Sequence, residues 1–181
     1  MADLPKLRTK TPEELAEFRR ISLARQQVRT TTHAVSARLT SERMKFILQS
    51  IAEPNTHLLA DSIDPIELHV FASNWNCDRG VEPLLEIVQH KVCDAGTALW
   101  LYWDNDPYFY LPYRSVNDAD DDETRTMLQL SRTVEDRISA NNFKTSTVPF
   151  DPRPWINEKY AAASWAVHTI PAVMYHPIGV L

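Results

Sequence analysis

Residues 74–103 decide the fold, and they read NWNCDRGVEPLLEIVQHKVCDAGTALWLYW. Asp94 is a natural N-cap, because its carboxylate can accept the free N–H groups at the start of a helix. Pro83 fits only the first turn of a helix, so an earlier helix begins near Gly80. Apolar residues of that earlier helix recur at the spacing of one stripe, namely Val81, Leu84, Leu85 and Val88. The stretch therefore predicts two short helices joined by a tight turn.

The helix that follows Asp94 is apolar on every side. Its inner stripe consists of Ala95, Ala98, Leu99 and Tyr102. Its opposite side is formed by Trp100, Leu101 and Trp103. A helix without a polar face packs against several neighbours, so we expect this one at the centre of the molecule.

The pattern Cys-Asp-x-Gly occurs twice, beginning at Cys77 and at Cys93. A solenoid needs about three stacked repeats to be stable. We therefore interpret the two copies as parts of one helical hairpin.

Composition indicates one globular domain spanning 1–181, with a frayed start at 1–10. The formal net charge of −5 argues against a general nucleic-acid-binding protein. There is no apolar run of membrane length and no signal-peptide core, so we expect neither a membrane partner nor secretion. Two cysteines do not make a disulfide framework, and we expect a cytoplasmic protein.

Helix signals recur along the rest of the N-terminal half. Thr11-Pro12-Glu13-Glu14 is a capping box, and the helix that it opens is expected to end near Arg29. The β-branched, polar residues 30–37 predict a connection. A second helix is expected from Ser41 to before Pro54, and another from Asp64-Pro65 to Asn74. A helical turn is expected at His57.

The C-terminal half begins with a long helix after the acids at 118–123 and then changes character. Residues 143–181 are rich in proline and β-branched side chains, with room for one short helix within 156–167. The apolar residues after Thr169 should either pack back on the helices or form a contact surface. The expected fold is mainly α: an irregular bundle of about six or seven helices, with a central helical hairpin and an extended C-terminal segment.

A metal site is one chemical possibility near the hairpin. Its potential ligands are His69, Cys77, His90 and Cys93. No familiar zinc-ligand spacing is matched, and thiols of this kind are more often buried as small apolar groups. We expect no metal and no cofactor.

Catalysis is a second possibility. Cys77 or Cys93, each close before a helix, could act as a nucleophile with His69 or His90 as the base. No third orienting group follows at a recognisable spacing, and three glycines leave little room for a phosphate-binding loop. Paired acids such as Asp104 and Asp106 are more typical of a solvated face. We therefore expect no catalytic residue, and a cysteine-dependent enzyme remains an alternative.

An acidic and aromatic segment is the best candidate for a binding surface. Tyr is enriched at the hot spots of protein interfaces, although these aromatic rings could instead cap the core. Phe109 belongs to the same segment. The predicted partner-binding residues are Asp104, Asp106, Tyr108, Tyr110, Tyr113, Asp118, Asp120, Asp121, Asp122 and Glu123.

Residues 64–104 resemble a bacterial domain of unknown function, DUF4274. The resemblance rests on Asp64-Pro65, on Asn74-Trp75 with Gly80, and on Cys93-Asp94-Ala95-Gly96-Thr97-Ala98-Leu99. The chain differs from the family pattern at Asn76 and Cys77, where the family typically has acids.

The resemblance implies a small cytoplasmic bacterial protein without established enzyme activity. Proteins of this kind often stand beside secreted toxins, which implies an immunity protein that binds and occludes a cognate toxin. A small, acidic, helical chain without catalytic motifs suits an inhibitor of a basic toxin. A helical adaptor in another bacterial assembly is the alternative among binding proteins.

Overall fold

The computed structural model describes residues 11–52, 62–157, 160 and 164–179. Within these residues the fold is mainly α, as predicted, and the one β-type pairing is an isolated bridge between Phe150 and Ile178. The helices are α1 (Pro12–Ser36), α2 (Ser41–Ala52), α4 (Pro65–Asn74), α5 (Glu82–Gln89), α6 (Ala95–Asp104) and α7 (Asp122–Ser139). Short 3-10 helices are η1 (Cys77–Arg79), η2 (Pro107–Tyr110), η3 (Val116–Asp118), η4 (Arg153–Trp155) and η5 (Ala172–Tyr175).

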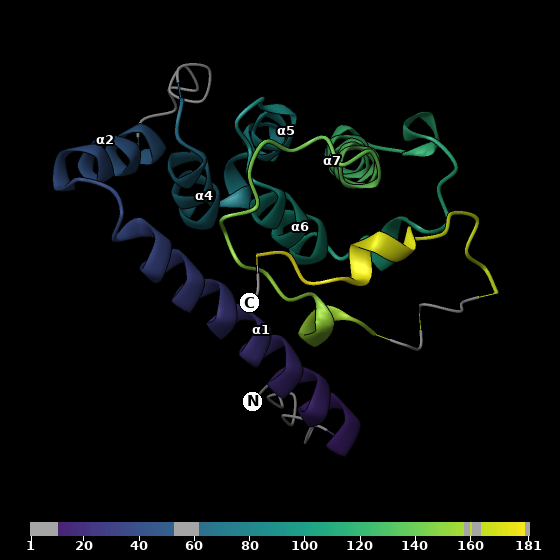
Figure 1. Cartoon of the computed structure of the whole chain (residues 1–181). Coiled ribbons are helices and arrows are strands. Elements are labelled where there is room, and N and C mark those ends of the chain that lie inside the picture. The colour runs from purple at the N-terminus through teal and green to yellow at the C-terminus, as the bar shows by residue number, and fades with distance from the viewer. Residues whose placement is uncertain (1–10, 53–61, 158–159, 161–163, 180–181) are drawn as a thin grey trace, which may run out of the picture.

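Helix α6 lies at the centre of the bundle. All of its residues from Ala95 to Trp103 are buried, as expected for a helix that is apolar on every side. Helices α5 and α7 pack on α6 and on each other, and α4 packs against α1, α2 and α5. Figure 1 shows α6 between α4 and α7, with α1 running diagonally along one side of the molecule.

The helix starts predicted from capping residues are confirmed. The Thr11 hydroxyl accepts the Glu14 N–H at 3.2 Å, and the Glu14 carboxylate accepts the Thr11 N–H at 2.7 Å. Asp64 and Asp94 each accept the N–H group two residues later. These side chains satisfy donors that have no partner inside the helix.

The connection predicted at residues 30–37 is wrong, because α1 continues to Ser36. The Thr30 hydroxyl donates to the Gln26 carbonyl, and Thr32 bonds to His69 in α4. Val35 is buried in the core. Tertiary packing against α4 therefore outweighs the weak helix propensity of the three threonines.

The first half of α1 is less buried than its apolar residues suggested. Leu15 is 43% exposed and Phe18 is 58% exposed, whereas Ala24 and Val35 are the two buried residues of the helix. Figure 1 shows the N-terminal end of α1 projecting beyond the other helices.

Part of the C-terminal segment packs back on the helices, the first of the two outcomes expected for it, whereas Val173 is 39% exposed. Ile170 and Met174 are buried. The Trp103 indole N–H donates to the Met174 carbonyl at 2.9 Å, which ties η5 to α6. The expected turn at His57 lies outside the described residues, as do residues 158–159 and 161–163 of the short helix expected within 156–167. No helix in the described part of the chain combines the length and the apolar character needed to cross a membrane.

Candidate functional site

The residues of the Cys93-to-Leu99 motif have structural roles: they start α6 and hold a neighbouring segment against it. The Asp94 carboxylate is fully buried. One of its oxygens accepts the N–H groups of Gly96 at 2.9 Å and Val148 at 3.2 Å. The other accepts the N–H of Thr147 at 2.7 Å and its hydroxyl at 3.1 Å. Asp94 therefore starts α6 and holds the extended segment 145–148 against it.

The glycine and threonine of the motif have equally structural roles. A Cβ atom on Gly96 would lie 1.8 Å from the Val148 carbonyl oxygen, so only glycine allows this approach. The Thr97 hydroxyl lies 3.0 Å from His69 Nδ1, and Thr32 lies 3.1 Å from His69 Nε2. The buried His69 ring thus links α1, α4 and α6.

The Asn74-to-Gly80 motif is a capped turn. The Trp75 indole N–H donates to the Gly80 carbonyl at 2.8 Å, and Asn76 accepts the Asp78 N–H at 3.1 Å. Gly80 has φ = 101°, a conformation that residues with a Cβ rarely adopt. Both halves of the sequence pattern are thereby accounted for by local structure.

Residues 63–139 match the family model of DUF4274, a domain of unknown function. The resemblance seen in the sequence is thus confirmed for this part of the chain. No curated protein and no solved structure matches the chain. The segment at 145–148, which Asp94 holds against α6, lies beyond the matched residues.

The four potential metal ligands have separate environments. His69 is held between two threonines, and the His90 ring accepts the N–H of Val92 at 3.3 Å. Cys93 is buried and Cys77 is exposed. Among the described residues, no three His, Cys, Asp or Glu side chains are placed to hold a metal ion.

Neither thiol is activated as a nucleophile. Burial raises the pKa of Cys93 to about 12. Desolvation and then the nearby carboxylates of Asp104 and Asp78 raise the pKa of Cys77. Burial also lowers the pKa of His69 to about 4, so its ring stays neutral. Since the thiolate is the reactive form of cysteine, these environments oppose a cysteine–histidine mechanism.

Carboxylates from four separate elements gather around Cys77. Asp78 and Glu82 line a shallow cleft with Cys77, and Glu123 approaches it from the start of α7. Asp104, at the end of α6, is close enough to raise the pKa of the same thiol. Burial, followed in size by the carboxylates of Asp106 and Glu123, also raises the pKa of Tyr110. We call the exposed carboxylates in this region the acidic surface: Asp78, Glu82, Asp104, Asp106, Asp118, Asp120, Asp121, Asp122 and Glu123.

Some of these carboxylates have structural roles. Asp118 accepts the N–H groups of Arg114 and Ser115, and Asp121 accepts the Thr124 N–H as the N-cap of α7. Asp122 pairs with Arg125. The others are better placed to meet a partner. Asp104, Asp120 and Glu123 make no side-chain hydrogen bond or ion pair with the described residues.

The aromatic part of the predicted surface is mostly inside. Tyr108 and Tyr110 are buried, and their hydroxyls bond to the Asn157 N–H and to Asn105. Tyr113 is half-buried. Phe109, by contrast, is 57% exposed. It is therefore the aromatic ring that this segment presents to solvent. Sequence reasoning did not foresee that Asp78 and Glu82 would join the same surface, because they lie more than twenty residues away.

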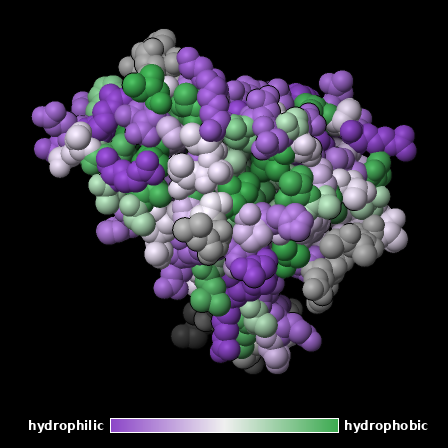
Figure 2. Space-filling view, in the orientation of Figure 1, coloured by the Kyte–Doolittle hydropathy of each residue, from purple (hydrophilic) through white to green (hydrophobic). Residues whose placement is uncertain are grey.

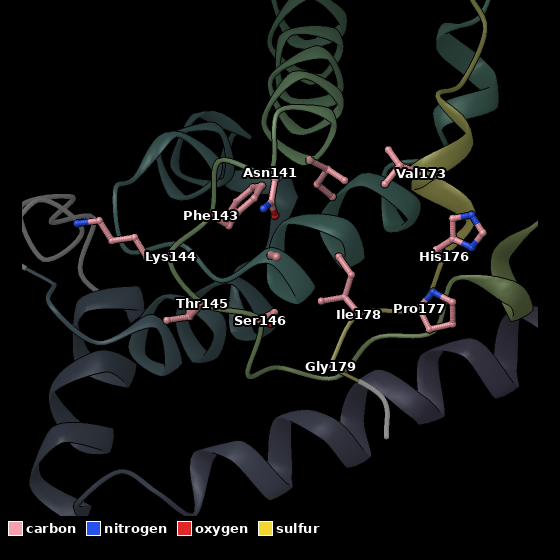
Figure 3. Close-up of a pocket in the computed structure, with 12 residues that line it drawn as sticks. Asn141, Phe143, Lys144, Thr145, Ser146, Val173, His176, Pro177, Ile178 and Gly179 are labelled. Carbon is pink, nitrogen blue, oxygen red and sulfur yellow. The ribbon is translucent and has the colours of Figure 1, made fainter.

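A separate pocket of about 380 Å³ lies between the end of α7 and the C-terminal segment. Figure 3 shows Asn141, Phe143 and Ile178 directed toward its interior, whereas Lys144 points away. Its remaining titratable residue is His176. The pocket lacks the paired acid and base that a reaction would need, so we assign it no chemistry.

Proposed function

We propose that this chain is a non-catalytic bacterial binding protein that recognises a basic protein partner through the acidic surface. The partner would be a cognate secreted toxin, which the chain neutralises in the cytoplasm by covering its active site. The observation that carries the proposal is the convergence of carboxylates from η1, α5, α6 and α7 around Cys77.

Charge supports a basic partner. Like-charged groups brought together repel one another, and this repulsion is relieved when a cationic surface binds. A formal net charge of −5 would add long-range steering of a basic toxin toward the protein. The exposed Phe109 ring supplies an apolar contact beside the carboxylates.

The absence of an activated nucleophile supports a non-catalytic role for the described part of the chain. The pKa of each thiol is raised, and His69 is fixed between two threonines. The proposal that the partner is a toxin rests on the resemblance to DUF4274 and on the acidic charge of the chain, and not on the geometry of the acidic surface.

A helical adaptor is the second candidate, and α1 favours it. The outward residues Leu15, Phe18 and Leu23 are 43%, 58% and 63% exposed on a helix that projects from the bundle. Figure 2 shows apolar and polar residues mixed on the surface of that projection. Such a face could dock on another protein without any acidic contact.

Co-expression with the product of the neighbouring gene tests the proposal. We expect the two proteins to co-purify and the chain to protect cells that express that product. The Asp120→Lys/Glu123→Lys variant should lose both properties, because it reverses two carboxylates that have no structural bond. Failure of the wild-type chain to bind or to protect would eliminate the immunity role.

Asp136→Lys is the matched control. Asp136 is exposed on the same helix, but it lies near the other end of α7. The substitution makes the same change in charge per site away from the acidic surface. If Asp136→Lys impaired binding as much as either single reversal, net charge rather than this surface would determine recognition. Loss of binding by Leu15→Glu/Phe18→Glu alone would favour the adaptor.

A further inference from the structure

A second cleft, distinct from the one at Cys77, lies between α1 and the end of α6. It has a cavity volume of about 220 Å³, with η2 and η4 contributing to its walls. Asp104 belongs both to this cleft and to the acidic surface, so the two features are continuous. The cleft residues are Glu17, Arg20, Ile21, Arg25, Trp103, Asp104, Asp106, Pro107, Tyr108, Trp155, Asn157 and Tyr160.

The balance of charge in the cleft is negative. Arg20 is engaged by Glu17 through two nitrogen–oxygen contacts and donates to the Pro154 carbonyl at 2.6 Å. Three carboxylates, those of Glu17, Asp104 and Asp106, thus face the two guanidiniums of Arg20 and Arg25, and Arg20 also acts on Asp106. Packing around Asp104 and Asp106 raises the pKa of both carboxyls by desolvation. A cation entering the cleft would relieve that cost.

Aromatic rings supply the other walls. The Trp103 and Tyr108 ring centroids are 5.8 Å apart, and those of Tyr108 and Tyr160 are 5.5 Å apart. The Trp155 indole nitrogen is buried and has no hydrogen-bond partner in the described structure. Because that nitrogen is shielded from solvent, Trp155 contributes its ring rather than its N–H to the cleft. Aromatic rings next to carboxylates are the chemistry that recognises organic cations.

We propose that this cleft binds a cationic side chain, lysine or arginine, of a protein partner. Asp104 and Asp106 would pair with the charge, and the rings of Trp155 and Tyr160 would contact the aliphatic stem. The inference rests on the proposed function for the kind of partner, but the binding of the side chain can be measured without that partner.

The probe is N-acetyl-lysine N-methylamide, titrated into the full chain labelled with ¹⁵N and followed at the tryptophan indole N–H signals. We expect a saturable shift, with at least tenfold weaker binding of the uncharged norleucine analogue. Asp104→Asn/Asp106→Asn should weaken lysine binding at least tenfold. Asparagine keeps the size of aspartate and tolerates the left-handed conformation of residue 106, where φ = 48°.

Asp136→Asn is the matched control, since it removes an exposed carboxylate outside both the cleft and the acidic surface, and it should change affinity less than twofold. Equal shifts with the lysine and norleucine amides would overturn the proposal. So would tight binding of N-acetyl-glutamate N-methylamide, which would identify Arg25 as an anion site. If the lysine amide does not bind but Asp120→Lys/Glu123→Lys still abolishes partner binding, the cleft proposal fails and the proposed function stands.

Discussion

Gly96 shows at the scale of one residue how the Cys93-to-Leu99 motif produces the fold. Gly96→Ala would gain about 1 kcal/mol of helix propensity. It would also place a methyl group 1.8 Å from the Val148 carbonyl oxygen, where neither backbone can move freely. Overpacking of this kind costs about 1–3 kcal/mol, and we expect a net loss of stability in urea unfolding. Ser22→Ala, at an exposed position of α1, should unfold like the wild type. A Gly96→Ala protein more stable than wild type would contradict the close approach.

His69 gives stability a dependence on pH. Its pKa is lowered from 6.5 to about 4 in the folded protein. Between these values the unfolded chain takes up a proton that the folded protein does not. The free energy of unfolding therefore falls as the pH falls from about 6.5 toward 4, and His69 contributes a loss of about 3 kcal/mol.

Urea unfolding at pH 7 and pH 5 measures this contribution. His69→Gln removes the titrating group, so it should be less stable than wild type at pH 7 and lose less stability between the two values. His33→Gln, at an exposed position, should retain the wild-type dependence. If His69→Gln kept the full wild-type loss between pH 7 and pH 5, another group would be responsible.

The two cysteines should differ in their accessibility to thiol reagents, although neither thiol is activated. Cys77 is exposed and should react with a thiol reagent, slowly at neutral pH because its pKa is raised. Cys93, fully buried with a pKa of about 12, should react only after denaturation. Reagent titration of the Cys77→Ser and Cys93→Ser variants separates the two. Rapid reaction of either thiol at neutral pH would instead support the hypothesis of a cysteine-dependent enzyme.

At the scale of elements, two aspartates that cap helices should contribute very different amounts to the free energy of unfolding. Asp94 caps α6 and also holds Thr147 and Val148, inside the protein. Asp121 caps α7 at an exposed position. We expect Asp94→Asn to cost about 2–4 kcal/mol, because an amide leaves some of these buried donors unpaired. Asp121→Asn should cost less than about 1 kcal/mol.

Hydrogen exchange tests the same pair of variants. Asp94→Asn should speed exchange at the Thr147 and Val148 amides, while Asp121→Asn leaves them unchanged. Unaltered protection at Thr147 in Asp94→Asn would mean that other contacts hold the segment.

Helix starts could be predicted from the sequence because caps act locally. The side chains of Thr11, Asp64 and Asp94 each accept a hydrogen bond from a backbone N–H two or three residues later, so a short stretch of sequence is enough to predict their capping roles. The end of α1 could not, because the helicity of residues 30–36 depends on a bond from Thr32 to His69, thirty-seven residues away. Leu15 and Phe18 stand three residues apart, the spacing of a core stripe, yet they are 43% and 58% exposed on a helix whose N-terminal end projects beyond the other described helices.

At the scale of the whole molecule, only part of the candidate surface could be predicted. The run of acids at 118–123 is visible in the sequence, but Asp78 and Glu82 join it through the packing of α5 against α7. Tyr108 and Tyr110 were predicted to bind a partner, and their rings are buried. Hydrophobic periodicity does not show whether an aromatic residue in a connection is buried against the core or exposed to solvent, because a connection has no repeating inner and outer face.

Association with a basic partner should depend steeply on salt. The charges of the acidic surface act through solvent, where the Debye length shortens from about 10 Å at 0.1 M ionic strength to about 3 Å at 1 M. The association rate constant should therefore fall at least tenfold between low and high salt, with a smaller change in the dissociation rate constant. Stopped-flow measurements with the purified partner test this, and Asp120→Lys/Glu123→Lys should flatten the salt dependence. Asp136→Lys should flatten it less per charge, because Asp136 lies far along α7 from Asp122. A rate constant independent of salt would instead point to recognition through apolar contacts, such as the exposed face of α1.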